Sequence, residues 1–394
     1  MFGRKKKEIH EIVAIFDIGS ASIGGALVAV PKGGKLKKKA RVLYSIRYPV
    51  SFQEDLHHER FTTLMLDAIG VVAAKLNDAD TGYPTRAYCF LASPWYTSQT
   101  RVVTYSKDIE FSYTESLAQK LIADDLKNFE SSHFKKYNQK GNEIRVIESK
   151  NIHVKLNGYS TNSPIGKKAH DAELTLFISM SPESILQSIE HKINSSLPVP
   201  TISFSSFLFS SYEVARSIHS HQKDFILIDV GGEITDVSVI KDDILIESST
   251  FPSGKNVLVR RIATHLQLSK EEALSLLCMY LSGHVEKILR KKIDAILDNA
   301  QDDWVGHFRT TLEKMSQLTS LPHVVFITAD EDITQWYVGA IQSEQFNQYM
   351  LTEKKFTVIA LESKALHGFL KFGYKVERDS FLLLETIYAS KLYS

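Results

Sequence analysis

Short apolar runs separated by polar turns make up most of this 394-residue chain, and two pairs of runs follow the same plan. Residues 12–30 and residues 225–240 each predict strand, tight turn and strand, because apolar residues flank a polar turn that contains glycine. Apolar positions at helical spacing occur in residues 61–76, 181–193, 257–266 and 381–392. This mixture of strands and amphipathic helices predicts an α/β protein.

The turn of the second hairpin has a composition suited to phosphate binding. Gly231 and Gly232 let the backbone approach a ligand closely, and successive N–H groups of the turn can surround an anion. Asp229 and Asp236 flank the turn, and carboxylate oxygens are suitable ligands for Mg²⁺. An ordinary β-hairpin with a Gly-Gly turn is the alternative interpretation of this segment taken alone.

The first hairpin repeats this arrangement near the start of the sequence. Its turn contains four candidate ligand residues, Asp17, Gly19, Ser20 and Ser22. Two phosphate-type hairpins in one chain predict two similar halves that face a shared cleft. A further candidate is Gly254-Lys255, where a predicted helix begins, because a helix N-terminus and a lysine can together hold a phosphate.

Residues 97–180 differ from the rest and predict an inserted α+β domain. Their strands are more polar, and the helix predicted at 112–128 begins with Ser112-x-x-Glu115, a capping-box pattern. We therefore predict that residues 1–96 form the first part of lobe 1 and that residues 181–222 return to it. Residues 223–394 form lobe 2, with a helical insertion at about 255–320.

Composition and charge exclude several classes of protein. The chain is 43% hydrophobic and 24% charged with a net charge of +1, which is typical of a soluble globular protein and not of a nucleic-acid polycation. Cys89 and Cys278 match no spacing typical of a metal or redox site, so we expect the protein to reside in a reducing cytoplasm. No apolar segment reaches the ~20 residues of a membrane-spanning helix. The basic segment at residues 1–7 is either a solubilising arm or a weak contact to an anionic membrane surface.

With both hairpins in place, the chain resembles the actin-like ATPase superfamily, and within it the bacterial FtsA/PilM group. Four stretches carry the resemblance, in the order of the sequence: residues 16–20, residues 157–159 with 164–166, residues 229–236, and residues 251–256. The resemblance implies an actin-like (ribonuclease-H-like) two-lobed α/β fold with an inserted small α+β domain like 1C of FtsA. The predicted segments then correspond to 1A, 1C, 2A and a 2B-like helical insert.

The resemblance also implies a site for ATP and Mg²⁺ between the lobes. Asp17 and Asp229 would face the metal ion, and no catalytic residue can be assigned. The residues that would contact the nucleotide are Asp17, Gly19, Ser20, Ser22, Asp229, Gly231, Gly232, Glu233, Thr235, Asp236, Gly254 and Lys255. Any enzymatic activity is expected to be at most a weak Mg²⁺-dependent ATPase.

Other positions depart from the pattern of the family on the adenosine side. Where the family usually has a Gly-Gly pair beside the adenosine, this chain has Ala329-Asp330-Glu331-Asp332, whose carboxylates would repel phosphates. Leu274 and Leu277 align with the Glu and Lys that relatives place near the base and ribose. These departures make a pseudo-ATPase, an interaction protein that has lost its nucleotide, the main alternative.

We therefore expect a cytoplasmic scaffold that helps to assemble a membrane-associated machine, PilM-like in type IV pilus assembly or FtsA-like in cell division. The implied partners are the cytoplasmic peptide of a membrane assembly protein or a tubulin-like division protein, with self-association as a further option. Nucleic acid is not an expected partner, and any membrane contact is expected to be peripheral. A sugar-kinase-type phosphotransferase is a third hypothesis, although no catalytic base can be identified in the sequence.

Overall fold

The computed structural model describes residues 10–31, 39–51, 58–137, 143–350, 354–374 and 376–393. The basic segment at residues 1–7 and most of the basic run at 35–39 lie outside the described residues. Within the described part of the chain, every helix is too short or too polar to span a lipid bilayer.

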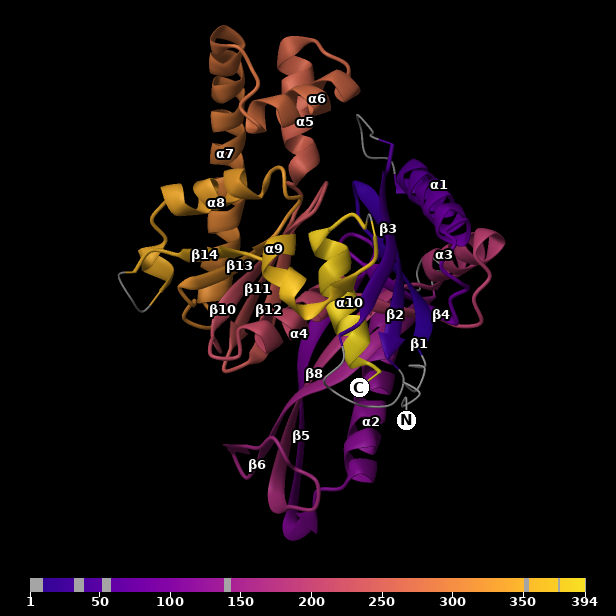
Figure 1. Cartoon of the computed structure of the whole chain (residues 1–394). Helices are drawn as coiled ribbons and strands as arrows, with labels where there is room; N and C mark the ends of the chain where they lie inside the picture. The colour runs from indigo at the N-terminus through magenta and orange to yellow at the C-terminus, as the bar shows by residue number, and fades with distance from the viewer. Residues whose placement is uncertain are drawn as a thin grey trace, which may run out of the picture.

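The first lobe is built on a six-stranded sheet with the order β15-β3-β2-β1-β4-β9 (Figure 1). Its strands are β1 (His10–Ile18), β2 (Ser22–Pro31), β3 (Arg41–Pro49), β4 (Arg86–Leu91), β9 (Ile202–Ser206) and β15 (Lys371–Phe372). The helices packed on it are α1 (His58–Asn77), α3 (Glu183–Ser196), α4 (Phe207–Ile218) and α10 (Ser380–Lys391). The central strand β1 is buried almost throughout because helices cover both faces of the sheet.

The second lobe contains a five-stranded sheet with the order β12-β11-β10-β13-β14. Its strands are β10 (Phe225–Val230), β11 (Thr235–Lys241), β12 (Ile244–Phe251), β13 (Val324–Thr328) and β14 (Thr357–Ala360). Its helices are α5 (Lys255–Leu266), α6 (Lys270–Leu281), α7 (Lys287–Ser316), α8 (Thr334–Ser343) and the short α9 (Ser363–Leu366), with 3₁₀ turns at Asn347–Tyr349 and His367–Phe369. In Figure 1, α5, α6 and the long α7 extend away from this sheet as a helical arm.

The two large sheets have the same internal plan. In each, an antiparallel three-stranded meander is followed by two parallel strands, which gives the orders β3-β2-β1-β4-β9 and β12-β11-β10-β13-β14. The two candidate phosphate hairpins, β1–β2 and β10–β11, occupy equivalent places at the start of each half. The structure thus contains the two similar halves that the hairpin pair predicts.

The insert forms a separate four-stranded sheet with the order β5-β8-β6-β7. Its elements are β5 (Thr97–Ser112), α2 (Glu115–Tyr137), β6 (Ile144–Leu156), β7 (Tyr159–Ser160) and β8 (Lys168–Pro182). It has a hydrophobic core of its own, and β5 also contacts the edge strand β12, where Thr100 Oγ1 donates to the Leu245 carbonyl over 3.1 Å. The insert therefore touches both lobes.

The capping box predicted at Ser112 does not form. Ser112 is the last residue of β5, and α2 begins three residues later, where Thr114 Oγ1 accepts a hydrogen bond from Leu117 N. Ser112 pairs instead with Lys168 in β8, so the strand partner outweighs the local capping pattern.

The end of the chain returns to the first lobe. β15 pairs with β3, and α10 packs on β1, β2 and α4, although the sequence assigns residues 223–394 to lobe 2. The physical reason is the composition of α10, which is buried on nearly all sides and needs the core of the first sheet to cover its apolar residues.

Candidate functional site

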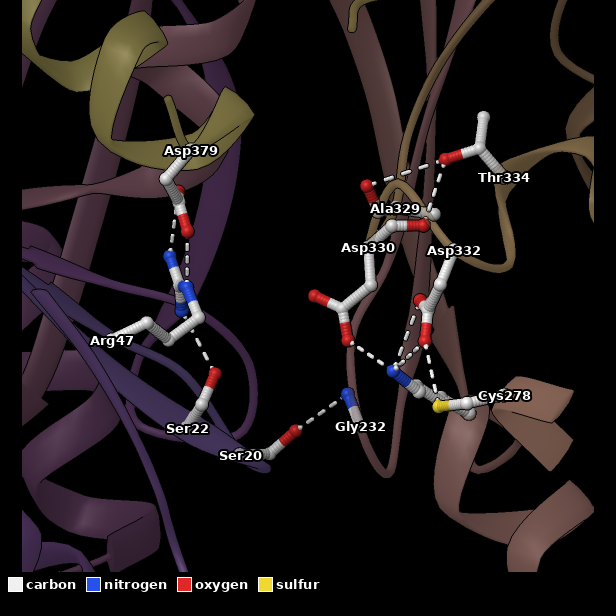
Figure 2. Close-up of polar contacts among 11 residues, drawn as sticks. Ser20, Ser22, Arg47, Gly232, Cys278, Ala329, Asp330, Asp332, Thr334 and Asp379 are labelled. Carbon is white, nitrogen blue, oxygen red and sulfur yellow. Dashed lines mark hydrogen bonds and ion pairs between the residues drawn. The ribbon is translucent and has the colours of Figure 1, made fainter. Parts of the chain in front are cut away.

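The turns of the two hairpins meet between the lobes. Ser20 Oγ, from the first turn, accepts hydrogen bonds from Gly232 N and Glu233 N of the second turn, each over 3.1 Å. Figure 2 shows the bond between Ser20 and Gly232. A Cβ atom added at Gly232 would lie 2.2 Å from Ala21 Cβ. The turns are therefore in direct contact, and a serine hydroxyl takes the two N–H groups that the sequence assigns to phosphate.

Arg47, in β3, binds two carboxylates on the first-lobe side of the cleft. Its Nη2 atom lies 2.6 Å from Asp17 Oδ2 and 2.8 Å from Asp379 Oδ1, and its Nε donates to Asp379 Oδ2. Its Nη1 donates to Ser22 Oγ over 2.8 Å. Figure 2 shows the guanidinium extended between Asp379 and Ser22. Two of the three polar side chains predicted as ligands in the first turn, Asp17 and Ser22, are thus engaged by one arginine.

Burial and neighbouring charges shift the pKa values of the carboxyl groups around Arg47. Burial raises the pKa of Asp17 above its ordinary value, although the Arg47 charge opposes the shift. Burial acts to raise the pKa of Asp379 as well, but Arg47 and the N–H groups at the start of α10 outweigh it and lower that pKa. Glu385 of α10 is fully buried beside Asp17; burial and then the Asp17 charge raise its pKa well above the ordinary value. Burial therefore favours the neutral form of Glu385.

On the second-lobe side, Asp229 and Asp236 are both buried and are engaged by hydroxyl groups. Thr328 Oγ1 donates to Asp229 Oδ1 over 2.8 Å, and Ser93 Oγ donates to Asp236 Oδ1 over 2.9 Å. Burial raises the pKa of Asp229 well above its ordinary value, with a further contribution from Asp236. Burial also raises the pKa of Asp236, to about 7. Neither carboxyl has an arginine or lysine among these partners.

The start of α5 packs against the second turn instead of facing an open space. Lys255 N donates to the Gly231 carbonyl over 3.1 Å, and Asn256 N donates to the Gly232 carbonyl over 2.8 Å. A Cβ atom at Gly254 would lie 2.4 Å from the Gly231 oxygen, so only glycine allows this approach. The first N–H groups of α5 therefore donate to backbone carbonyls of the second lobe.

Lys255 turns toward the acidic segment that follows β13. Its Nζ lies 2.9 Å from Asp330 Oδ2 and 2.9 Å from Asp332 Oδ2, and Cys278 Sγ also contacts Asp332 (Figure 2). Burial acts to lower the pKa of Lys255, but the two aspartates outweigh it and raise that pKa. Glu331 instead accepts from Ser380 Oγ over 3.1 Å, which links the acidic segment to α10.

Two predicted ligand residues, Glu233 and Thr235, interact with other residues of the second lobe. Glu233 accepts from Asn256 Nδ2 over 2.7 Å and forms an ion pair with Arg260. Thr235 donates to the Ser253 carbonyl over 2.6 Å and accepts from the Trp304 indole N–H over 3.2 Å. The structure thus brings the predicted residues of both turns together and gives their side chains protein partners.

A chain of the PilM-PilN type IV pilus biogenesis complex is similar to this protein over nearly its whole length. The match covers 96% of this chain and 97% of that chain, with a TM-score of 0.63 and 9% sequence identity. The chain has the actin-like ATPase fold. This finding confirms the predicted fold class, including the two lobes and the inserted α+β domain.

Two further solved structures match the actin-like chain with lower scores. One is a Bacteroides thetaiotaomicron protein described as having an actin-like ATPase fold and unknown function, matched over 96% of each chain with a TM-score of 0.42 and 8% identity. The other is a diol dehydratase-reactivating factor in nucleotide-free form, matched over 97% of this chain and all of that chain, with a TM-score of 0.44 and 8% identity. No protein-family model and no curated protein sequence matches the chain.

In the arrangement of the lobes that the structure describes, the groups predicted to bind Mg·ATP are engaged by protein atoms. The first-turn carboxylate is bound to Arg47, the N–H groups of the second turn are bound to Ser20, and Lys255 is bound to two aspartates. Asp229, the second predicted metal ligand, lies in a setting that favours its neutral form. Within the described residues there is no group of three or more His, Cys, Asp or Glu arranged to hold a metal ion.

Arg47, Asp379 and Glu385 lie close together in the site and are not predicted from the sequence. None lies in a recognisable motif, and Asp379 is separated from Arg47 by 332 positions. A weak signal exists in Gly24, which pairs with Arg47 across β2 and β3. A Cβ atom there would lie 2.9 Å from Arg47 Nη2, so a glycine in mid-strand marks a place where a neighbouring side chain crosses the backbone.

Proposed function

We propose that this chain is an actin-like interaction scaffold of a membrane-associated machine, similar in role to PilM, and that it works without bound nucleotide. The similarity to a chain of the PilM-PilN complex over 96% of the sequence, insert included, supports the scaffold role. The engagement of the predicted phosphate- and metal-binding groups by protein atoms is the observation that carries the second part. Because the matched chain belongs to a type IV pilus biogenesis complex, we favour a role in pilus assembly over a role in cell division.

Such a scaffold needs a site for its partner, and we propose that this site is the junction between the insert and the first lobe. A cavity of about 360 Å³ lies there, lined by apolar side chains that include Trp95, Tyr96, Ile144 and Met180. An apolar side chain from an extended segment of a partner suits such a cavity. We propose that the partner is the cytoplasmic segment of a membrane-anchored assembly protein, which would bring the scaffold to the inner face of the membrane.

Site-specific cross-linking in the cells that make the protein tests this partner site. A photo-crosslinking amino acid at Gln99, an exposed residue beside the cavity, is expected to capture a membrane-anchored protein. The same amino acid at Glu271, exposed on α6 in the second lobe, is the control and should capture no such protein. Equal capture at the two positions, or none at Gln99, would contradict the site.

Titration of the protein with Mg·ATP tests the nucleotide-independent part. Calorimetry on the wild type and on Asp229→Ala is expected to give no saturable heat in either protein up to millimolar nucleotide. The melting temperature of the wild type should also stay constant, because any ligand that binds only the folded state raises it.

A nucleotide-coupled scaffold is the second candidate, favoured by one observation. Both turns keep the carboxylate, glycine and hydroxyl residues expected of a phosphate cleft, at Asp17, Gly19, Ser20, Asp229, Gly231 and Thr235. In this candidate the lobes would open, release Ser20 from the second turn and admit Mg·ATP. Saturable wild-type binding that Asp229→Ala abolishes would establish this candidate and reject the nucleotide-independent one.

A further inference from the structure

Arg47 lies where the first-turn carboxylate would meet a metal ion, and its guanidinium bridges oxygen groups as such an ion would. The same Nη2 atom contacts Asp17 Oδ2 at 2.6 Å and Asp379 Oδ1 at 2.8 Å, while Nη1 contacts Ser22 Oγ at 2.8 Å. These ligands are hard oxygens, which are the atoms that Mg²⁺ and Mn²⁺ prefer. A metal ion and the guanidinium cannot occupy this position together.

The surroundings of the guanidinium are built to receive it. Asp379 is the N-cap of α10 and accepts from Leu382 N over 2.9 Å, so its carboxylate is held in place independently of Arg47. The Phe381 ring lies under the guanidinium, with its centroid 5.3 Å from Arg47 Cζ. Gly24 leaves the space that Nη2 occupies. A planar cation with several donors matches this set better than a lysine would.

Access to the position is open from the cleft. Arg47, Asp379 and Asp330 contribute to the wall of a cavity of about 250 Å³ between β3, the segment after β13 and the start of α10. The Arg47 side chain is 21% exposed, and that of Asp17 behind it is 4% exposed. Small ions can therefore reach Arg47, whereas the buried Asp17 carboxylate is reached only if Arg47 moves.

We propose that Arg47 is a resident cation that replaces a divalent metal ion at Asp17, Ser22 and Asp379, and so makes the closed cleft independent of metal. The inference rests on the proposed nucleotide-independent function and names the residue responsible. Removal of the guanidinium leaves two carboxylates facing one position without a counter-ion. That position then becomes a site for a small, hard divalent cation such as Mn²⁺.

Rescue of an Arg47→Met variant by Mn²⁺ tests the proposal. We expect its melting temperature to lie at least about 5 °C below that of the wild type, because the ion pairs of Arg47 with Asp17 and Asp379 are lost. Millimolar Mn²⁺ should recover several degrees of this loss and should leave the wild type unchanged. If Arg47→Met does not fold alone, the readout becomes Mn²⁺-dependent folding measured by circular dichroism, since metal binding and folding are coupled.

Two control variants separate a specific site from a general salt effect. Arg47→Lys keeps a cation at the position and should show no response to Mn²⁺. The double variant Arg47→Met/Asp379→Asn removes one of the two carboxylates and should lose most of the rescue. An equal Mn²⁺ response in the wild type, or no Mn²⁺ response in Arg47→Met, overturns the proposal.

The proposal for Arg47 and the proposed function can fail independently of each other. Wild-type binding of Mg·ATP would reject the nucleotide-independent scaffold whatever Arg47 does. A wild type that binds no nucleotide, together with an Arg47→Met variant that ignores Mn²⁺, would reject the resident cation and leave the scaffold standing.

Discussion

Asp236 shows how burial alone changes the chemistry of a candidate metal ligand. The residue lies at the wall of a cavity of about 440 Å³ beside the Ser93-Pro94 turn, and a serine hydroxyl is its hydrogen-bond partner. Burial raises its pKa from the ordinary value of 3.8 to about 7. A carboxyl that titrates near neutrality is a poor permanent ligand for a divalent ion, because the ion requires the ionised form.

The raised pKa of Asp236 predicts a pH dependence of stability. Its protonated form adds stability that is fully present below pH 3.8 and is lost as the pH rises through about 7. Between pH 5 and pH 8 the wild type should therefore lose about 2–3 kcal/mol of unfolding free energy through this residue. Asp236→Asn, which cannot ionise and can still accept from Ser93, should lack that loss. Urea unfolding at the two pH values measures the difference.

A matched substitution on the surface separates this effect from a general change in charge. Asp302→Asn removes an exposed carboxylate on α7 and should leave the pH profile of the wild type unchanged. If Asp236→Asn follows the wild-type profile as closely as Asp302→Asn does, Asp236 does not titrate in this range.

At the residue scale, the sequence predicts the members of the two turns but not their partners. Asp17, Ser20 and Gly232 are recognisable because glycine, carboxylate and hydroxyl residues recur in two local patterns. Arg47 and Asp379 are not recognisable, because an ion pair between distant residues leaves no periodic signal in the sequence. Those distant partners determine which atoms the side chains of the turns bind in the folded protein.

At the element scale, the strands and helices with strong periodicity are predictable. The hairpins β1–β2 and β10–β11 and the helices α5 and α10 lie where the apolar patterns place them. The start of α2 is not predictable, because Ser112 has both a capping pattern and a strand partner in β8, and only the tertiary structure decides between them. The apolar pattern of α10 predicts a buried helix but does not specify which of the two sheets covers it.

The N-terminus of α5 is a second place where tertiary packing, and not the local sequence, decides the outcome. The sequence predicts a helix N-terminus with Gly254 and Lys255, a combination suited to phosphate. The structure instead brings the second turn so close that its carbonyls accept the first amides of α5. Local sequence specifies that donors exist at this end of the helix, and packing between segments specifies which acceptor receives them.

At the scale of the whole molecule, the two lobes and the insert are closed by contacts from many segments. The turns meet through Ser20, Thr100 of the insert bonds the edge strand β12, and Glu331 bonds Ser380 at the start of α10. Tyr212 of α4 also donates to the Asp243 carbonyl of the second lobe over 2.5 Å. These contacts are distributed over the interface, so the closed arrangement is also supported away from the two turns.

Gly232→Ala tests whether direct contact between the turns sets this closure. Its new Cβ would lie 2.2 Å from Ala21 Cβ and 2.9 Å from Ala21 N, so the two lobes must separate locally. We expect about 1–3 kcal/mol less stability and a larger radius of gyration by X-ray scattering. Gly306→Ala in α7 is the control, because no atom lies within 4 Å of its Cβ position and a helical alanine should be neutral or stabilising. A Gly232→Ala protein as compact and stable as the wild type would mean that the contact between the turns does not hold the lobes together.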